Sequence, residues 1–146
     1  MKFVKAAVAI APFMFASAAV AADHEIQMLN KGPDGQPMWY EPAILIAEPG
    51  DTVTFLPSSK GHNVESMLVP EGAEEWKSKM NKEINITVES EGVYAYKCTP
   101  HFGSGMIGFI VVGDPSVNLE EVKGLRYAGK SKKVAEELIA QIEAGM

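Results

Sequence analysis

From residue 25 to residue 112, short apolar or β-branched runs alternate with breaks at Gly, Pro, Asp and Asn. In the clearest runs, Val53/Phe55 and Ile84/Ile86/Val88, every second side chain is apolar, which is the period of a strand with one buried face. The pattern predicts six strands, at residues 25–29, 43–47, 52–56, 84–89, 93–97 and 107–112. Short strands at this spacing are typical of an antiparallel sandwich or barrel, so we expect an all-β fold.

The segment 71–79 departs from the alternating pattern. Charged side chains surround Trp76 there instead of alternating with apolar ones. We expect a short surface helix at this place, which caps one side of the sandwich.

The C-terminal part of the chain has the periodicity of helices. Asn118 and Glu121 have the spacing of a capping box, which predicts the start of a first helix. From Ser131 onward, apolar residues recur every fourth position, at Val134, Leu138 and Ile142. We therefore expect two short helices within residues 116–144, packed on the β-sandwich of residues 23–114 as part of a single domain 23–146.

The first 22 residues have the composition of a secretory signal peptide. Lys2 and Lys5 form a basic start, an apolar run follows at residues 8–15, and small residues fill positions 17–22. The apolar run is too short for a comfortable membrane anchor, so we expect cleavage after Ala22 and a secreted protein. The remaining chain has 11 basic and 19 acidic residues, a net charge of −8, which gives no support for nucleic-acid binding. No later stretch is long and apolar enough to span a bilayer.

Metal-ligating side chains gather near the end of the predicted sandwich. The only cysteine, Cys98, is followed by His101 and Met106 in the spacing Cys-x2-His-x4-Met, and His62 in a turn-like run offers a second imidazole. Two imidazoles, a thiolate and a thioether suit copper, because soft sulfur favours Cu(I) and imidazole accepts Cu(II). The pattern predicts one copper site for electron transfer, with Cys98, His101 and Met106 as ligands and His62, which lies in no motif beyond Gly-His-Asn, as a candidate fourth ligand.

Other interpretations of these residues remain open at this point. A lone cysteine is often a small buried hydrophobe, and Cys98 with His101 could form a nucleophile and base, although Met106 would then have no role. A periplasmic copper chaperone or storage protein is the main alternative, although such proteins tend to offer several Met or Cys ligands. The third histidine, His24, lies beside the expected cleavage site and is expected to be a solvated terminal residue.

The sequence resembles the small blue copper proteins, the cupredoxins, and among them the pseudoazurins. The Cys-x2-His-x4-Met spacing differs from that of azurins and amicyanins but is shared with plastocyanins, and the two-helix tail favours pseudoazurins. The resemblance covers essentially the whole mature chain and rests on the runs at residues 28–32, 48–51, 61–66, 70–72 and 97–103.

The resemblance implies a cupredoxin-like Greek-key β-sandwich with one type 1 copper. It assigns His62, Cys98, His101 and Met106 as ligands and Asn63 as a residue that braces the cysteine loop. Gln27 stands where many pseudoazurins have a histidine, so a pH dependence attributed to that histidine is not expected here.

The resemblance also implies a function. It indicates a monomeric periplasmic electron carrier, not an enzyme, which reduces a copper nitrite reductase in denitrification or exchanges electrons with c-type cytochromes. Partners would dock transiently around the exposed edge of His101. The apolar and basic residues expected on this face are Met38, Pro57, Pro100, Lys31, Lys60, Lys77 and Lys97.

Overall fold

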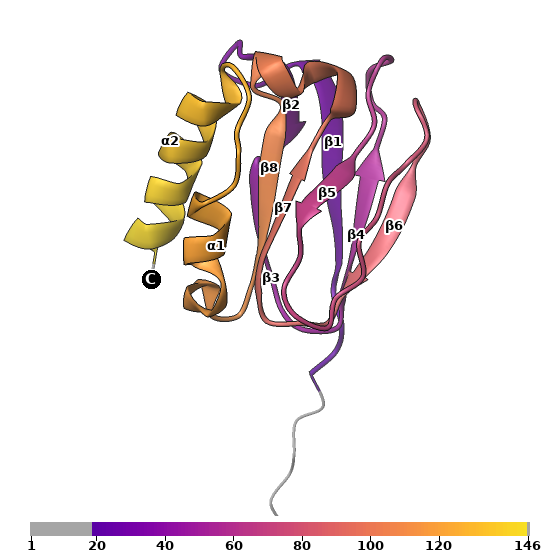
Figure 1. Cartoon of the computed structure of the whole chain (residues 1–146). Helices are drawn as coiled ribbons and strands as arrows, with labels where there is room; N and C mark the ends of the chain where they lie inside the picture. The colour runs from indigo at the N-terminus through magenta and orange to yellow at the C-terminus, as the bar shows by residue number, and fades with distance from the viewer. Residues whose placement is uncertain (1–18, 146) are drawn as a thin grey trace, which may run out of the picture.

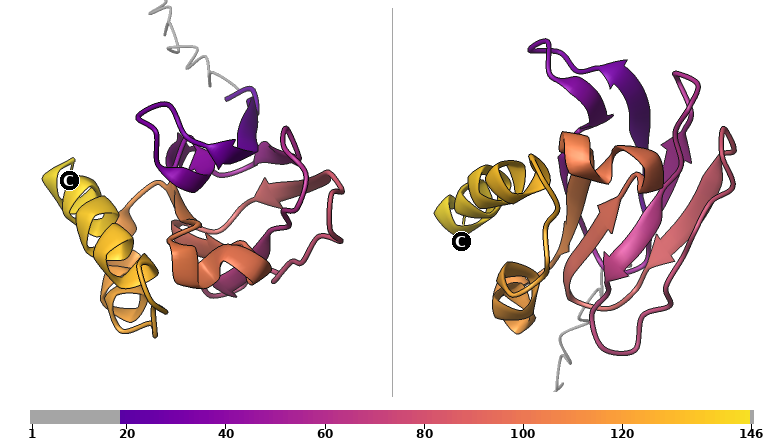
Figure 2. Two further views of the ribbon diagram at one scale, coloured as in Figure 1. Left: turned by 90° about the horizontal axis from the view of Figure 1, so that it is seen from above. Right: turned by 45° about the horizontal axis from the view of Figure 1, so that its top comes forward.

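The computed structural model describes residues 19–145. Most of the signal peptide expected at residues 1–22 lies outside the described residues. The described chain forms a sandwich of two sheets with two helices packed against one side, as Figures 1 and 2 show. Between residues 19 and 145, none of the helices is long and apolar enough to cross a membrane.

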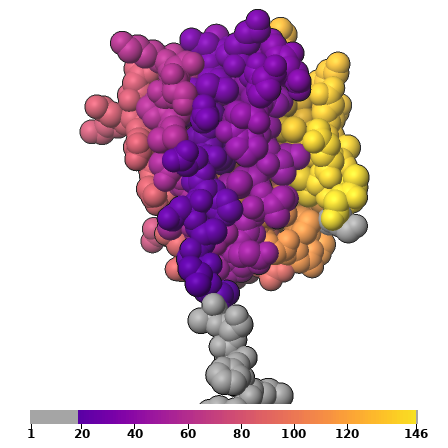
Figure 3. All heavy atoms as spheres, turned by 180° about the vertical axis from the view of Figure 1, so that it is seen from behind, coloured from indigo at the N-terminus to yellow at the C-terminus, as the bar shows by residue number. Residues whose placement is uncertain are grey.

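Each sheet has four strands. The first sheet has the order β2-β1-β4-β6, with β1 at Asp23–Lys31, β2 at Pro37–Glu41, β4 at Asp51–Leu56 and β6 at Ile84–Val88. The second has the order β3-β8-β7-β5, with β3 at Ile44–Ala47, β5 at Glu65–Leu68, β7 at Gly92–Lys97 and β8 at Ile107–Val112. Seen from behind, the N-terminal part of the chain covers one face of the sandwich (Figure 3).

The expectation of purely antiparallel pairing is wrong for two strand pairs. β1 pairs with β4 in parallel, and β3 pairs with β8 in parallel. The reason is the path of the chain. After the hairpin β1–β2 the chain crosses to the second sheet as β3, and it then returns to the first sheet as β4, which runs beside β1 in the same direction. Such crossovers join the two sheets by connections that a strand pattern does not reveal.

The main core fills the space between the sheets. It holds the large buried rings of Tyr40, Phe55 and Tyr96, packed edge to face with centroids 5.0–6.3 Å apart. The centroid separations and near-perpendicular planes are those that aromatic pairs prefer. Cys98 and Met106 belong to the same buried cluster, so the sulfur atoms lie at one end of this core.

The predicted C-terminal helices are present and cover the outer face of the second sheet. They are α1 (Leu119–Lys123) and α2 (Ser131–Ala144), preceded by the 3-10 turn η2 (Pro115–Val117). Leu138 and Ile142 of the predicted stripe are buried, while Val134 is half-buried. Because the helices bury this face, all six residues of β8 are buried, and the strand shows no alternation.

The helix expected at residues 71–79 does not form. The segment runs as an irregular loop in which Ser66 N donates to the Trp76 carbonyl and Trp76 N donates to Ser66 Oγ, both at 3.0 Å. Trp76 lies in the core with 9% of its surface exposed, stacked on Phe55. Burial of the indole against the sheet therefore decides the local conformation, and the charged neighbours remain outside.

Two polar residues have partners other than those expected. Asn118 makes no capping hydrogen bond to α1; its amide instead accepts from Val93 N at 2.7 Å and donates to Val93 O at 2.9 Å. His24 is not a free terminal residue, because its Nε2 lies 2.8 Å from Oδ2 of the buried Asp51. Both side chains join elements that are distant in sequence.

Candidate metal centre

One loop joins β7 to β8 at the upper end of the sandwich in Figure 1 and carries three of the candidate ligands. Its ends are fixed because Lys97 pairs with Ile107, and Cys98 N then donates to Met106 O at 3.0 Å. Between them lies the 3-10 turn η1 (Thr99–Ser104), which ends at Gly105 with φ +100°, a conformation that favours glycine. The closed loop places Cys98, His101 and Met106 around one space.

His62 enters this space from the loop between β4 and β5. It is fully buried, and its Nε2 lies 2.7 Å from the side-chain oxygen of Asn30 on β1. Because an amide oxygen only accepts, Nε2 carries the proton and Nδ1 keeps a free lone pair. The lone pair of His62 therefore points towards the cysteine loop.

The donor atoms of three side chains converge. The ligand atoms of His62, Cys98 and His101 all lie within 4.8 Å of one another. Nδ1 of His62 is 3.2 Å from Nδ1 of His101, and Cys98 Sγ is 3.8 Å and 3.5 Å from these two nitrogens. Met106 is fully buried beside Cys98 in the core and belongs to the same loop.

The surroundings disfavour the charged forms of two of these groups, Cys98 and His62. Burial raises the pKa of the Cys98 thiol, although nearby backbone N–H groups of Asn63 and His101 partly oppose this effect. Burial lowers the pKa of His62, and repulsion from His101 lowers it further. Two imidazole nitrogens and a cysteine sulfur are donors that bind a borderline-soft cation, which would also favour the thiolate. The donor set fits copper.

A brace joins the two ligand-bearing loops. Asn63 Nδ2 donates to Thr99 Oγ1 at 2.9 Å, and Thr99 N donates to Asn63 Oδ1 at 2.8 Å. Tyr40 on β2 donates its hydroxyl hydrogen to the Asn63 carbonyl at 2.6 Å. Asn63 was identified from the resemblance, whereas Tyr40 was not, because β2 itself was not predicted.

Helix α2 supports the cysteine loop from the other side. The hydroxyl of Ser131 donates to the carbonyl of Phe102, and Lys130 N donates to the Gly103 carbonyl at 3.0 Å. Ser131 is fully buried at this contact. The C-terminal tail therefore positions the ligand loop, a role that its apolar periodicity does not reveal.

The comparisons with known proteins agree with this geometry. The family model of copper binding proteins of the plastocyanin/azurin family matches residues 26–113. Pseudoazurin from Paracoccus pantotrophus is 45% identical over 139 residues, which cover 94% of this chain and 95% of the relative. The chain belongs to the pseudoazurins. Among solved structures, the pseudoazurin from Sinorhizobium meliloti is 54% identical with a TM-score of 0.82, covering 86% of this chain and 99% of that one.

A second solved structure extends the comparison. Native pseudoazurin from Hyphomicrobium denitrificans is 40% identical with a TM-score of 0.77, covering 82% of this chain and 97% of that one. As a pseudoazurin, the protein is a blue copper electron-transfer protein with a single type 1 copper site. The predicted cupredoxin sandwich and the predicted cofactor are both confirmed.

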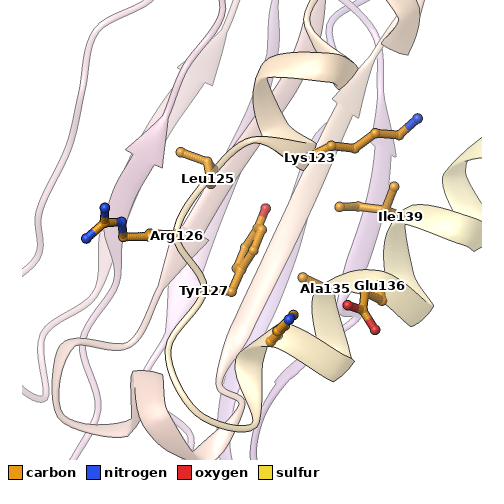
Figure 4. A pocket seen from close by; sticks show the side chains of 8 residues that line it. Lys123, Leu125, Arg126, Tyr127, Ala135, Glu136 and Ile139 are labelled. Carbon is orange, nitrogen blue, oxygen red and sulfur yellow. The ribbon is translucent and has the colours of Figure 1, made fainter.

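A separate hollow of about 490 Å³ lies between the α1–α2 connection and α2 (Figure 4). Tyr127 stands in it and donates its hydroxyl hydrogen to the Val122 carbonyl at 2.8 Å. None of the residues that line it is a histidine, cysteine or methionine. This hollow is therefore distinct from the pseudoazurin metal centre.

Proposed function

We propose that His62, Cys98, His101 and Met106 hold the copper, and that the chain carries single electrons between redox proteins of the periplasm. The acceptor we propose is a copper nitrite reductase of denitrification, with a c-type cytochrome as the alternative partner. The observation that supports the proposal most strongly is the convergence of three donor side chains within 4.8 Å at one end of a packed core.

The protein's contribution to electron transfer is a donor arrangement that is already in place. Copper supplies a Cu(II)/Cu(I) couple when it is bound. The Asn30 oxygen fixes the His62 ring, the Asn63–Thr99 brace fixes the Cys98 end of the loop, and Met106 offers a neutral buried sulfur. Because these groups are held by hydrogen bonds and packing, they have little to rearrange when the charge of the site changes by one.

We further propose that electrons leave at the half-exposed His101. Pro100 beside it is exposed and lines a shallow hollow of about 650 Å³ together with Asn63, Ser78 and Thr99. Lys77, Lys79 and Met80 line the same hollow, and Met80 is 45% exposed. Neither Lys79 nor Met80 was expected on this face: Lys79 belongs to the segment 71–79 that was expected to be helical, and Met80 follows it.

Charge favours an acidic partner on this face. Lys60 is exposed in the loop that carries His62, and Lys97 lies with its Nζ 4.9 Å from the Phe102 ring centroid, at the base of the ligand loop. Lys77 is paired with Glu65 at 3.3 Å, so it offers less free charge than the other two. Basic side chains around an apolar contact steer a weakly bound acidic partner into position.

Two measurements test the proposal. Titrating Cu(II) into the metal-free protein should produce an intense blue absorption that saturates at one copper per chain. Mixing the Cu(I) form with an oxidised copper nitrite reductase should bleach the enzyme's oxidised copper signal and restore the blue colour at a rate that rises with enzyme concentration. Copper passing to the partner, with no electron exchanged, would instead identify a chaperone.

A further inference from the structure

β1 begins at the end of the sandwich opposite the β7–β8 loop (Figure 1). Asp51, the first residue of β4, lies beside this start of β1, and its carboxylate is almost fully buried. Its oxygens accept from three donors: Ala22 N at 2.8 Å, His24 Nε2 at 2.8 Å and Glu48 N at 2.9 Å. These hydrogen bonds lower the pKa of Asp51 to about 2, so it is ionised at neutral pH. A buried carboxylate requires compensating donors, and one of them is the backbone nitrogen of Ala22.

Ala22 also continues the strand ladder. Its carbonyl accepts from Thr52 N at 2.9 Å, directly before Asp23 pairs with Thr52 in the parallel β1–β4 register. Cleavage after Ala22 would therefore remove one donor of Asp51 and the acceptor of Thr52 N. Within residues 19–145, the backbone of residues 19–21 makes no such contact, and Val20 is 90% exposed.

The residues before Ala22 fit a processing site one position earlier than the expected one. Ala19-Val20-Ala21 has small residues at the two positions that a signal peptidase reads, in the pattern A-x-A. Cleavage between Ala21 and Ala22 hydrolyses that amide bond, leaving a carboxylate on Ala21 and an amine on Ala22. At neutral pH most such amines carry a proton.

We propose that processing leaves Ala22 as the first residue, and that its new ammonium group forms an ion pair with Asp51. The inference rests on the proposed secretion of the chain. Processing converts a neutral N–H donor into a charged one at a carboxylate that is already in place, and hydrogen bonds to charged groups are stronger than neutral ones. The position of signal cleavage therefore affects the stability of the fold, because the new N-terminus holds the start of β1 against Asp51.

The processing step is tested by secreting the full precursor from a Gram-negative host and measuring the intact mass of the periplasmic protein. A mass that begins at Ala22 supports the inference. A mass that begins at Asp23 overturns it while leaving the proposed secretion intact. An unprocessed chain overturns the proposed secretion as well.

The ion pair is tested by copper-loaded proteins released from a cleavable tag so that they begin at Ala21, Ala22 or Asp23. The Ala21 form is the matched control, because it keeps the Ala22 N–H but moves the charge one residue away. We expect the highest thermal unfolding midpoint for the Ala22 form and the lowest for the Asp23 form. When Asp51→Asn is introduced into both proteins, the Ala21 and Ala22 forms should have the same thermal unfolding midpoint. Equal midpoints for these two forms in the presence of Asp51 would overturn the ion pair.

Discussion

Asn63 and Thr99 bind each other through two hydrogen bonds, at 2.9 Å and 2.8 Å, and so join the loop of His62 to the loop of Cys98. Asn63 is 3% exposed, so water cannot replace these bonds readily. The pair fixes the separation of two ligand-bearing segments that lie far apart in the sequence. Its loss should therefore affect both stability and the metal centre.

We expect Asn63→Ala to lower the free energy of unfolding by about 2 kcal/mol, because buried hydrogen-bonding groups lose their partners. The blue absorption should also shift, since the Cys98 loop is no longer held against His62. Asn85→Ala is the control, because Asn85 makes a comparable bond to Thr54 on the exposed side of the first sheet. Denaturant unfolding and visible spectra of both variants test this; a spectral shift in both would contradict the assigned role.

The two sulfur ligands should behave differently on substitution. Met106→Leu should retain copper but change the colour and the reduction potential, because a neutral thioether would be the weakest of the four donors and would tune the metal more than hold it. Cys98→Ser should abolish the blue colour. Copper content and visible spectra distinguish the two, and equal copper loss in both variants would contradict the role of Met106 as the weakest of the four donors.

Substitution of two buried tyrosines by phenylalanine should change the free energy of unfolding in opposite directions. In the described part of the chain, the Tyr96 hydroxyl has no hydrogen-bond partner, whereas the Tyr40 hydroxyl donates to Asn63 O at 2.6 Å. Tyr96→Phe should raise the free energy of unfolding by about 1 kcal/mol, because it removes an unsatisfied buried group. Tyr40→Phe should lower it by about 1–2 kcal/mol. Denaturant unfolding measures both, and destabilisation by Tyr96→Phe would reveal an unseen partner of its hydroxyl.

The proposed docking face predicts that lysines of equal formal charge differ in their effect on partner association. Lys60→Glu and Lys97→Glu should each slow association with an acidic redox partner by about tenfold at low salt and flatten its salt dependence. Lys133→Glu is the control, because Lys133 lies on α2 beside Glu137, at 3.7 Å. Stopped-flow rates at several ionic strengths test this. Equal effects at all three positions would leave net charge as the only cause.

The lowered pKa of Asp51, about 2, predicts a pH dependence of stability. A carboxyl group with a lower pKa in the folded state stabilises the fold above its unfolded pKa, near 4, and loses this effect as pH falls towards 2. The unfolding midpoint of Asp51→Asn should therefore be below that of the unsubstituted protein at about pH 6, and the gap should narrow below about pH 4. The exposed Asp34→Asn serves as the control. A constant gap would contradict the role of the ionised form.

The sequence predicted the strands with a clear pattern and failed where packing decides. β2 was missed because it is short, begins at Pro37 and contains Met38 at φ +54°. β5 was missed because all four of its residues are half-buried, so no alternation marks it. The segment 71–79 was expected to form a surface helix because charged residues surround Trp76 in the sequence, whereas the observed loop is set by the burial of Trp76 against Phe55.

The four candidate ligands were predicted because their chemistry is carried by residue type and spacing. Their support was predicted less well. The Asn30 contact to His62 and the Ser131 contact to Phe102 join positions that are distant in sequence, and no local pattern records them. The parallel pairings depend likewise on crossovers, which strand periodicity does not encode.

The connection between β7 and β8 holds three of the proposed ligands between two positions, Lys97 and Ile107, that pair at the end of the β7–β8 ladder. Connections of this kind tolerate changes of length and sequence, because the ladder beneath them is already complete. Exchange of the whole segment would therefore leave the ladder intact, provided that the contacts of the loop to Asn63 and to α2 are kept. A different metal site could in this way arise by replacement of the β7–β8 loop on an otherwise unchanged β-sandwich.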